Sequence, residues 1–265
     1  MAQNNSNQNN GVKKQEALTK LRMASELYVL MSGFTKMPYV SCDPDTYDDQ
    51  VLIFWTEEEA KQEAKKLLEN KELVSIVKVE NKQLLAFYSS LFAMGVNALF
   101  VSRGLEGETR IQLDEFVKRP QADKLPEGQV HVENPEFHLT ALYLMQAVRR
   151  DPNAAKEEAV KELQEEMLAD FQKGRYIVPV EPQKGLPVMK QKDGTIFQPV
   201  FTDAAEFAKF NREKRFQAAV VEFAKLGEIL APEAKGVMDQ IHGGKCSPAD
   251  CPEEKRRRKR VSYIY

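Results

Sequence analysis

The chain has 265 residues, of which 42% are hydrophobic and 29% are charged, and its formal net charge at pH 7 is −2. This composition is ordinary for a globular protein, and the length allows one large or two compact domains. The longest apolar run, residues 91–101, is interrupted by Asn97 and is far shorter than the ~18 residues that indicate a membrane span. We therefore expect no transmembrane segment.

The N-terminal residues 1–11 are polar and of low complexity, and they contain neither a basic region nor an apolar region of the kind found in signal peptides. Such a composition cannot bury enough apolar surface to order the chain, so it predicts a disordered lead-in. The chain has only three cysteines, which do not make a disulfide framework and favour a reducing, cytoplasmic location.

In the first half, apolar periodicity predicts helices and strands in alternation. Helices are predicted over residues 12–25, 56–70 and 82–94, and strands over residues 27–31, 37–41, 50–55, 73–79, 97–101 and 110–113. Thr56 followed by Glu59 matches a capping box, which marks the start of the second helix. Asn81 is expected to cap the third helix, and Leu84 and Leu85 on that helix are expected to be deeply buried.

The second half begins with two predicted helices whose starts carry the same sequence signal. Asn134 and Asp151 are each followed by a proline, and a polar cap before a proline is typical of a helix start. Strands are then predicted over residues 175–180, 186–188, 195–201 and 215–221, and helices from residue 203 and over residues 222–230. Asp203 and Glu206 again fit a capping box, at the start of the helix that follows the third of these strands.

The second half repeats the pattern of the first. A constant offset of 141 carries Val79 onto Val220 and Gly95 onto Gly236, and it predicts that residues 215–221 form a strand, although their own spacing also fits a helix. The predicted fold is therefore α/β (α+β): two tandem copies of a small mixed β-sheet domain with packed helices. The predicted boundaries are 12–119 for domain 1, 120–133 for a linker, 134–243 for domain 2 and 244–265 for a flexible tail.

Both halves resemble the SseB family, which is named for enhanced serine sensitivity in bacteria. In the second half the resemblance lies in residues 176–180 (YIVPV), 198–207 (QPVFTDAAEF) and 236–237 (GV). In the first half it lies in residues 38–40 (PYV), 54–60 (FWTEEEA) and 95–97 (GVN). The resemblance covers most of the chain and implies two SseB-like domains in a cytoplasmic bacterial protein whose role is poorly defined. It brings no catalytic residues and no cofactor.

The predicted tail contains a continuous run of basic residues. The run consists of Lys255, Arg256, Arg257, Arg258, Lys259 and Arg260. Because no acidic residue follows the run, removing its six charges from the net −2 leaves −8 for residues 1–254. Six contiguous cations cannot be buried without partners. They predict either a solvated tail or a weak contact with an anionic partner, which is a nucleic acid or a membrane surface.

Three other groups of residues are candidates for a metal-binding or catalytic site. His242, Cys246 and Cys251 have a spacing that suggests zinc, but structural zinc needs four ligands with tighter spacing, so incidental thiols are the favoured interpretation and no metal is expected. Four aspartates closely follow Cys42, and their charges disfavour a reactive thiolate. His131 and His138 are expected to be surface or capping residues.

These observations predict no catalytic residue, no cofactor and no metal. The favoured hypothesis is a non-enzymatic, cytoplasmic protein-interaction or regulatory protein of the SseB type, whose partner is another protein. The alternative is a regulatory protein that binds a small ligand in the cleft between its two domains. The sequence does not identify the partner, the ligand or the oligomeric state.

Overall fold

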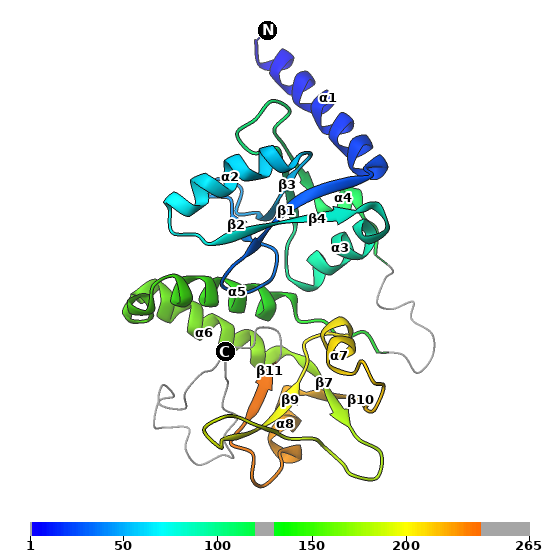
Figure 1. Ribbon diagram of the computed structural model, residues 1–265, viewed down its shortest axis with the longest axis vertical. Coiled ribbons are helices and arrows are strands. Elements are labelled where there is room, and N and C mark those ends of the chain that lie inside the picture. The colour runs from blue at the N-terminus through cyan, green and yellow to red at the C-terminus, as the bar shows by residue number, and fades with distance from the viewer. Residues whose placement is uncertain (1, 120–129, 240–265) are drawn as a thin grey trace. The chain divides into compact units, whose positions relative to one another are not determined.

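The structure, a computed structural model, describes residues 2–119 and 130–239 (Figure 1). It is a mixed α/β protein, as the sequence predicts. Contacts divide the chain into two compact units. Unit 1 comprises Met1–Gln121 and Ala141–Leu163, and unit 2 comprises Ala122–Thr140 and Gln164–Tyr265. The units are thus interleaved along the chain, whereas the sequence predicts one continuous stretch for each domain; the tandem boundaries stay a prediction.

Unit 1 is built on a mixed six-stranded sheet with helices packed on it. Its strands are β1 (Glu26–Ser32), β2 (Val40–Cys42), β3 (Asp49–Phe54), β4 (Val74–Glu80), β5 (Ala98–Val101) and β6 (Thr109–Gln112). Its own helices are α1 (Ala2–Met23), α2 (Glu57–Glu69), α3 (Asn81–Ala93) and the short α4 (Leu113–Phe116). The strand order is β4-β1-β3-β5-β6, with β2 paired to β3. Only the pair β3–β5 is parallel within this sheet.

Helix α2 covers one face of this sheet and closes the main apolar core. Its start is the predicted one: the Thr56 side chain accepts a hydrogen bond from the Glu59 N–H at 3.2 Å, and the Glu59 carboxylate accepts from the Trp55 N–H at 2.9 Å. The buried side chains of this core are Leu30, Tyr39, Leu52, Phe54, Ala60, Leu67 and Phe100. Alternate residues of the strands and the residues on one face of α2 are thus buried together in this core.

The N-terminal part of unit 1 departs from the prediction. Residues 1–11 are predicted to be disordered, but α1 begins at Ala2. The packed part of this helix starts at Ala17, and once a helix is nucleated each further residue costs little, so polar residues can continue it toward the N-terminus.

Helix α3 also differs in detail from the prediction. Glu80 is its N-cap, and Asn81 is its first residue and not the cap. Leu84 is buried as expected, but Leu85 is 70% exposed. The buried face of α3 consists of Leu84, Tyr88 and Leu91, and Leu85, one residue on from Leu84, points about 100° away from that face.

The helices after the first sheet belong partly to each unit. They are α5 (Pro135–Arg150), the 3-10 helix η2 (Pro152–Lys156) and α6 (Glu158–Lys173). The single helix predicted after Asp151 is therefore broken at Glu157, whose extended backbone ends η2. The C-terminal half of α5 packs within unit 1: the Tyr143 hydroxyl donates to Asp49 Oδ1 at 2.5 Å, and Arg150 pairs with Glu72.

Unit 2 contains two small sheets joined by one bridge. Its strands are β7 (Arg175–Val180), β8 (Met189–Lys190), β9 (Ile196–Val200), β10 (Gln217–Glu222) and β11 (Val237–Asp239), and its short helices are α7 (Ala204–Phe210) and α8 (Phe223–Ile229). The sheet orders are β10-β7 and β11-β9-β8, and the bridge Ile177↔Phe201 joins β7 to β9. Most of the segment 215–221 is thus in a strand, as the repeat predicts, but β10 begins two residues later and ends one residue later than predicted.

The two units share a strand order, but the predicted offset of 141 is wrong. The N-caps Glu80 and Glu222 correspond at an offset of 142. The Asn97 N–H bonds the Asp49 carbonyl, and the Lys235 N–H bonds the Ile196 carbonyl in the same position, so the strand after the helix corresponds at an offset of 138. The glycine match misled the prediction because α8, with seven residues, is shorter than α3, with thirteen.

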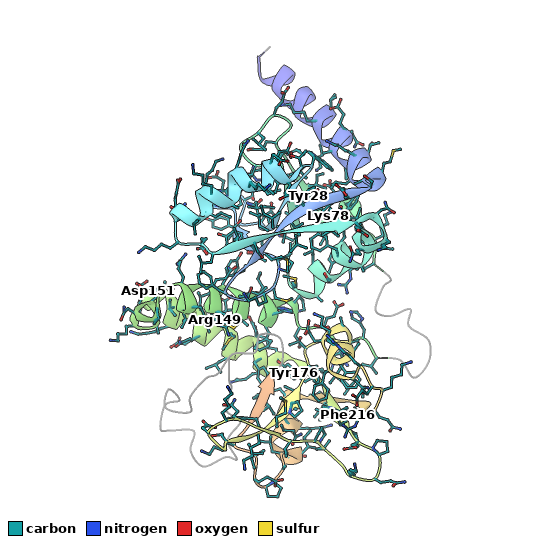
Figure 2. All side chains as sticks on the ribbon, viewed as in Figure 1. Tyr28, Lys78, Arg149, Asp151, Tyr176 and Phe216 are labelled. Atoms are coloured by element: carbon teal, nitrogen blue, oxygen red, sulfur yellow. The ribbon has the colours of Figure 1, made fainter. Side chains whose placement is uncertain are left out.

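A tightly packed joint connects α6 to β7 in unit 2 (Figure 2). The Asn134 amide donates to the carbonyls of Arg175 and Thr202, each at 2.8 Å. The fully buried Tyr176 donates its hydroxyl to the Phe171 carbonyl at 2.8 Å. Gly174 lies between them: a Cβ atom there would stand 2.4 Å from Asn134 Oδ1 and 2.5 Å from the Tyr176 hydroxyl. Gly174, which directly follows the last residue of α6, is therefore required by this packing.

Candidate functional site

The anionic contacts predicted for the tail fall outside the part of the chain that the structure describes. Residues 255–260 lie outside the described residues, and so do His242, Cys246 and Cys251. Among the residues that the structure describes, no group of three His, Cys, Asp or Glu side chains is placed to hold a metal ion. In the same part of the chain, no helix is long and apolar enough to cross a membrane.

The other three candidates have ordinary surroundings. Cys42 ends β2 at the surface, and desolvation, followed by the charges of Asp49 and Asp43, raises the pKa of its thiol, which makes a poor nucleophile. His131 Nε2 lies 3.2 Å from the Glu133 carboxylate. His138, which was expected to be a surface or capping residue, is buried on α5. It lies on the same helical face as Ala141, Leu142 and Met145, which are also buried.

A polar groove lies on unit 1 between α2, β5 and the turn after β2. Its volume is about 540 Å³. Two carboxylates on its wall are buried and paired: Asp43 with Arg110 at 2.7 Å, and Glu63 with Lys66 at 3.2 Å. Backbone hydrogen bonds from Thr46 and Asp45 are the main reason why the pKa of Asp43 is lowered. A carboxylate whose pKa is lowered in this way is a poor general acid at neutral pH, so Asp43 is not suited to that role.

Phe100 lines the groove, and two guanidinium groups lie over its ring. The Cζ atoms of Arg110 and Arg103 lie 4.0 Å and 5.8 Å from the ring centroid. Gln50 and Ser41 also line the groove, but Gln50 Oε1 and Ser41 Oγ are themselves buried and have no hydrogen-bond partner within the described part of the chain. The polar groups that the groove exposes are therefore the partly exposed side chains of Arg103 and Arg110.

A second candidate is the edge strand β10 of unit 2. Within the described residues β10 pairs with β7 alone, in antiparallel register. The Phe223 N–H bonds the Gly174 carbonyl at 3.1 Å, so the odd-numbered residues of β10 direct their backbone groups to β7. Pro179, which has no N–H, accordingly stands opposite Ala218. The even-numbered residues Ala218 and Val220 therefore direct their N–H and C=O groups away from the sheet, whereas the backbone groups of Phe216, just before β10, are both bonded by the Asn211 side chain.

The side chains on this edge are apolar and exposed. Ala218 and Val220 are exposed, Val220 by 40%, and Phe216 stacks on Phe210 at 5.2 Å between ring centroids (Figure 2). The cause is the length of the covering helix: α7 has seven residues, whereas α2, which packs over β4 in unit 1, has thirteen. Helices rise ~1.5 Å per residue, so α7 covers about half the length that α2 covers.

The equivalent edge strand in unit 1 is protected. Lys78 occupies the position in β4 that Val220 occupies in β10, and its ammonium group pairs with Glu26 at 3.2 Å (Figure 2). Val74 and Ile76, the other outward residues, pack against the core beneath α2. A lysine on the edge and a helix over it are standard protections against unwanted strand pairing. In the part of the chain that the structure describes, β10 has neither of these protections. The run Ala-Ala-Val-Val is the sequence signal by which this open edge could have been recognised.

Comparison with known protein families finds a match in the second half of the chain. The family model for the SseB protein N-terminal domain matches residues 153–243, a stretch that includes α6 and the strands β7 to β11. The resemblance is thus supported for this part, and for the first half it stays a prediction. A search of curated proteins finds no match.

Two solved structures also match, at low similarity. Tic22 from Plasmodium falciparum is 10% identical, with 83% of this chain and 88% of that chain covered and a TM-score of 0.21. Tic22 from Anabaena, described as a protein of protein transport, is 11% identical, with 80% and 83% covered and a TM-score of 0.20. At such scores neither likeness supports a conclusion about the fold or the function of this chain.

Proposed function

We propose that the chain is a non-enzymatic protein-interaction protein, and that it binds an extended protein segment by strand addition at the open edge of β10. The observation that carries this proposal is the row of outward N–H and C=O groups at Ala218 and Val220, which no helix and no charged side chain of the described residues protects. An added strand satisfies such groups directly, while its side chains contact the apolar surface beside them.

The apolar surroundings of β10 support the same function. Phe207 and Phe210 are partly buried and pack on the small core of Val132, Ile177 and Phe201. Together with the exposed Val220 they border the face that the short α7 leaves uncovered. Apolar area removed from water is worth ~25 cal/mol per Å², so a segment that covers this face gains stability beyond its backbone hydrogen bonds.

The test uses a proline that blocks the edge without breaking the sheet. Ala218→Pro removes an outward N–H but no hydrogen bond to β7, and proline is tolerated at edge positions of this kind. Complexes from native cells are compared for the wild type, Ala218→Pro and Val77→Lys, a control at a residue that is also 40% exposed. The expected result is protection of the β10 amides from hydrogen exchange in the wild-type and Val77→Lys complexes. A complex that forms equally well with Ala218→Pro contradicts the proposal.

The groove of unit 1 favours a second candidate function, the binding of a small ligand. The partly exposed Arg103 and Arg110 side chains would hold an acceptor or anionic group of the ligand. Thermal unfolding in the presence of a panel of small metabolites tests this function. A ligand of the groove should stabilise the wild type and should lose that effect in Arg103→Ala. The predicted ligand site in the cleft between two domains stays a separate prediction.

We also propose that the two units are divergent copies of one SseB-like domain, in a cytoplasmic protein. The common strand order supports the duplication: β4-β1-β3-β5 and β10-β7-β9-β11 have the same pairings, with the third and fourth strands parallel in both. An experimental structure in which β11 pairs with a strand other than β9 would contradict it. The cytoplasmic location is argued from the cysteine count alone, and cell fractionation tests it.

A further inference from the structure

We infer that residues 261–265 of this chain (Val-Ser-Tyr-Ile-Tyr) pair as an antiparallel strand with the open edge of β11, with Ile264 opposite Val237. The inference names the occupant of a second edge of unit 2, distinct from β10. It rests on the proposed duplication of one domain. Three observations carry it: the strand that β11 lacks, the direction of the β11 backbone, and the sequence of residues 261–265.

Strand β5 of unit 1 has a neighbour on each side, whereas its counterpart β11 does not. Strand β5 lies between β3 and β6, and β6 is antiparallel to it. Within the described residues of unit 2, β11 pairs with β9 alone. One edge of β11 is therefore open in this part of the chain, at the place where β6 stands in unit 1.

The backbone groups that face this open edge are those of Val237 and Asp239. The Gln198 N–H bonds the Gly236 carbonyl at 3.0 Å, so the backbone groups of Gly236 face β9. Successive residues of a strand alternate in direction, and the odd-numbered residues of β11 therefore face away from β9. In an antiparallel pair such residues exchange both hydrogen bonds with the residues opposite them.

The corresponding edge of β5 shows which side chain such a strand brings. The Leu113 N–H bonds the Asn97 carbonyl at 2.7 Å, so the odd-numbered residues of β5 face β6, and Leu99 stands opposite Ile111. Both of these side chains are fully buried. The offset of 138 carries Leu99 onto Val237, which is also buried. An apolar, β-branched residue is therefore expected opposite Val237.

One stretch of residues 240–265 has the composition of a strand. Residues 240–254 include two adjacent glycines and two prolines, and residues 255–260 are all basic, whereas residues 261–265 are β-branched or aromatic apart from one serine. Residues 262–264 (Ser-Tyr-Ile) repeat the pattern of residues 109–111 of β6 (Thr-Arg-Ile): a hydroxyl residue, a long side chain and isoleucine. This match puts Ile264 opposite Val237, as Ile111 stands opposite Leu99.

The connection from β11 to this segment is long enough for the pairing. It consists of residues 240–260, and a linker of that length spans about 25 Å on average, whereas paired strands lie about 4.8 Å apart. A tethered segment is present at an effective concentration of about a millimolar, so even a weak strand pair forms. The pairing also holds the basic run 255–260 beside unit 2, directly before the added strand.

The experiment is residue-resolved amide hydrogen exchange on the full chain. The amides of Val237 and Asp239 are expected to be protected in the wild type. In Ile264→Lys they are expected to exchange at least about tenfold faster, because an ammonium group cannot be buried beside Val237 without a partner. Tyr263→Lys is the matched control. Its side chain lies on the other face of the strand, where Arg110 of β6 is 40% exposed, so protection is expected to persist.

Equal exchange at Val237 and Asp239 in the wild type and in Ile264→Lys overturns the inference, because residues 261–265 are then not what protects this edge. A loss of protection of equal size in Tyr263→Lys overturns the register. Faster exchange at Ala218 and Val220 of β10, in place of β11, also overturns the inference.

The amide of Met238 separates this inference from the duplication on which it rests. This amide faces β9, because Met238 lies two residues after Gly236 in β11. It is expected to be protected in all three chains, which verifies that β11 stays paired with β9 in the variants. A Met238 amide that is unprotected in the wild type overturns the proposed duplication as well, whereas a protected one leaves the duplication standing whatever happens at Val237.

Discussion

Gly174 is expected to be the most sensitive small residue in unit 2. A methyl group at this position would stand 2.4 Å from Asn134 Oδ1, 2.5 Å from the Tyr176 hydroxyl and 2.7 Å from Tyr176 Cζ, which are distances that real Cβ contacts do not reach. Asn134 is buried and holds two carbonyl groups, and Tyr176 is fully buried. Neither side chain can move without breaking a buried hydrogen bond.

The cost of Gly174→Ala follows from these contacts. Overpacking a closed site typically costs about 1–3 kcal/mol, and a displaced buried hydrogen bond costs about 1–3 kcal/mol more. We therefore expect a loss of about 3 kcal/mol in the free energy of unfolding, which corresponds to a fall in Tm on the order of 10 °C. The assay is thermal and urea unfolding followed by far-UV circular dichroism.

Two further variants make this prediction specific. Gly11→Ala adds a methyl group that meets nothing within 4 Å and should not lower the stability. The double variant Gly174→Ala with Asn134→Ala should be more stable than the sum of the single effects predicts, because the second change removes one of the clashing atoms. A Gly174→Ala protein as stable as the wild type, or strictly additive effects, would refute the reasoning.

The remaining predictions concern a buried carboxyl group, a helix face and the tail. Burial is the largest cause of the raised pKa of Asp49, so the folded state favours the protonated carboxyl group. The contribution of this group to stability is lost as pH rises through its folded pKa. Above that pH, Asp49→Asn should therefore be more stable than the wild type in thermal unfolding. Leu84→Ala should cost about 2–4 kcal/mol and Leu85→Ala less than about 0.5 kcal/mol in urea unfolding; equal effects would contradict the packing of α3. Removing residues 255–265 should abolish any salt-sensitive binding of the protein to anionic vesicles or RNA, and equal binding by both chains would show that the basic run is a bystander.

Local signals in the sequence predicted the elements well. The box of Thr56 and Glu59 locates the start of α2, and the capping residue Asp203, which accepts from the Glu206 N–H at 2.8 Å, locates the start of α7. Such signals succeed because donor and acceptor lie within one turn of each other, so the sequence alone brings them together. The repeat, and not local spacing, predicted a strand over residues 215–221, because their own spacing also fits a helix; the observed strand is Gln217–Glu222.

The errors arose where distant residues decide the outcome. The offset of 141 failed because glycines can be aligned by type, whereas the register of β11 on β9 is set by hydrogen bonds between residues far apart in sequence. The exposure of Leu85 depends on which face of α3 meets the sheet. Nor could the sequence show that Gln50 and Ser41 face each other across two strands with buried, unpartnered oxygens, since that depends on the packing around them.

The interleaving of the two units determines how the protein can be cut. Ala141–Leu163 belongs to unit 1, where Tyr143 bonds Asp49 and the Gln146 amide reaches the Val40 carbonyl at 3.4 Å. A fragment that stops at residue 119 lacks this segment and leaves the apolar surface beneath it in water. Such a fragment should be insoluble or readily digested by proteases, and a fragment that begins at residue 134 should carry half of a helix with no surface of its own to cover. Cleavage within residues 120–129, by contrast, should leave a nicked protein whose two pieces stay associated through α5.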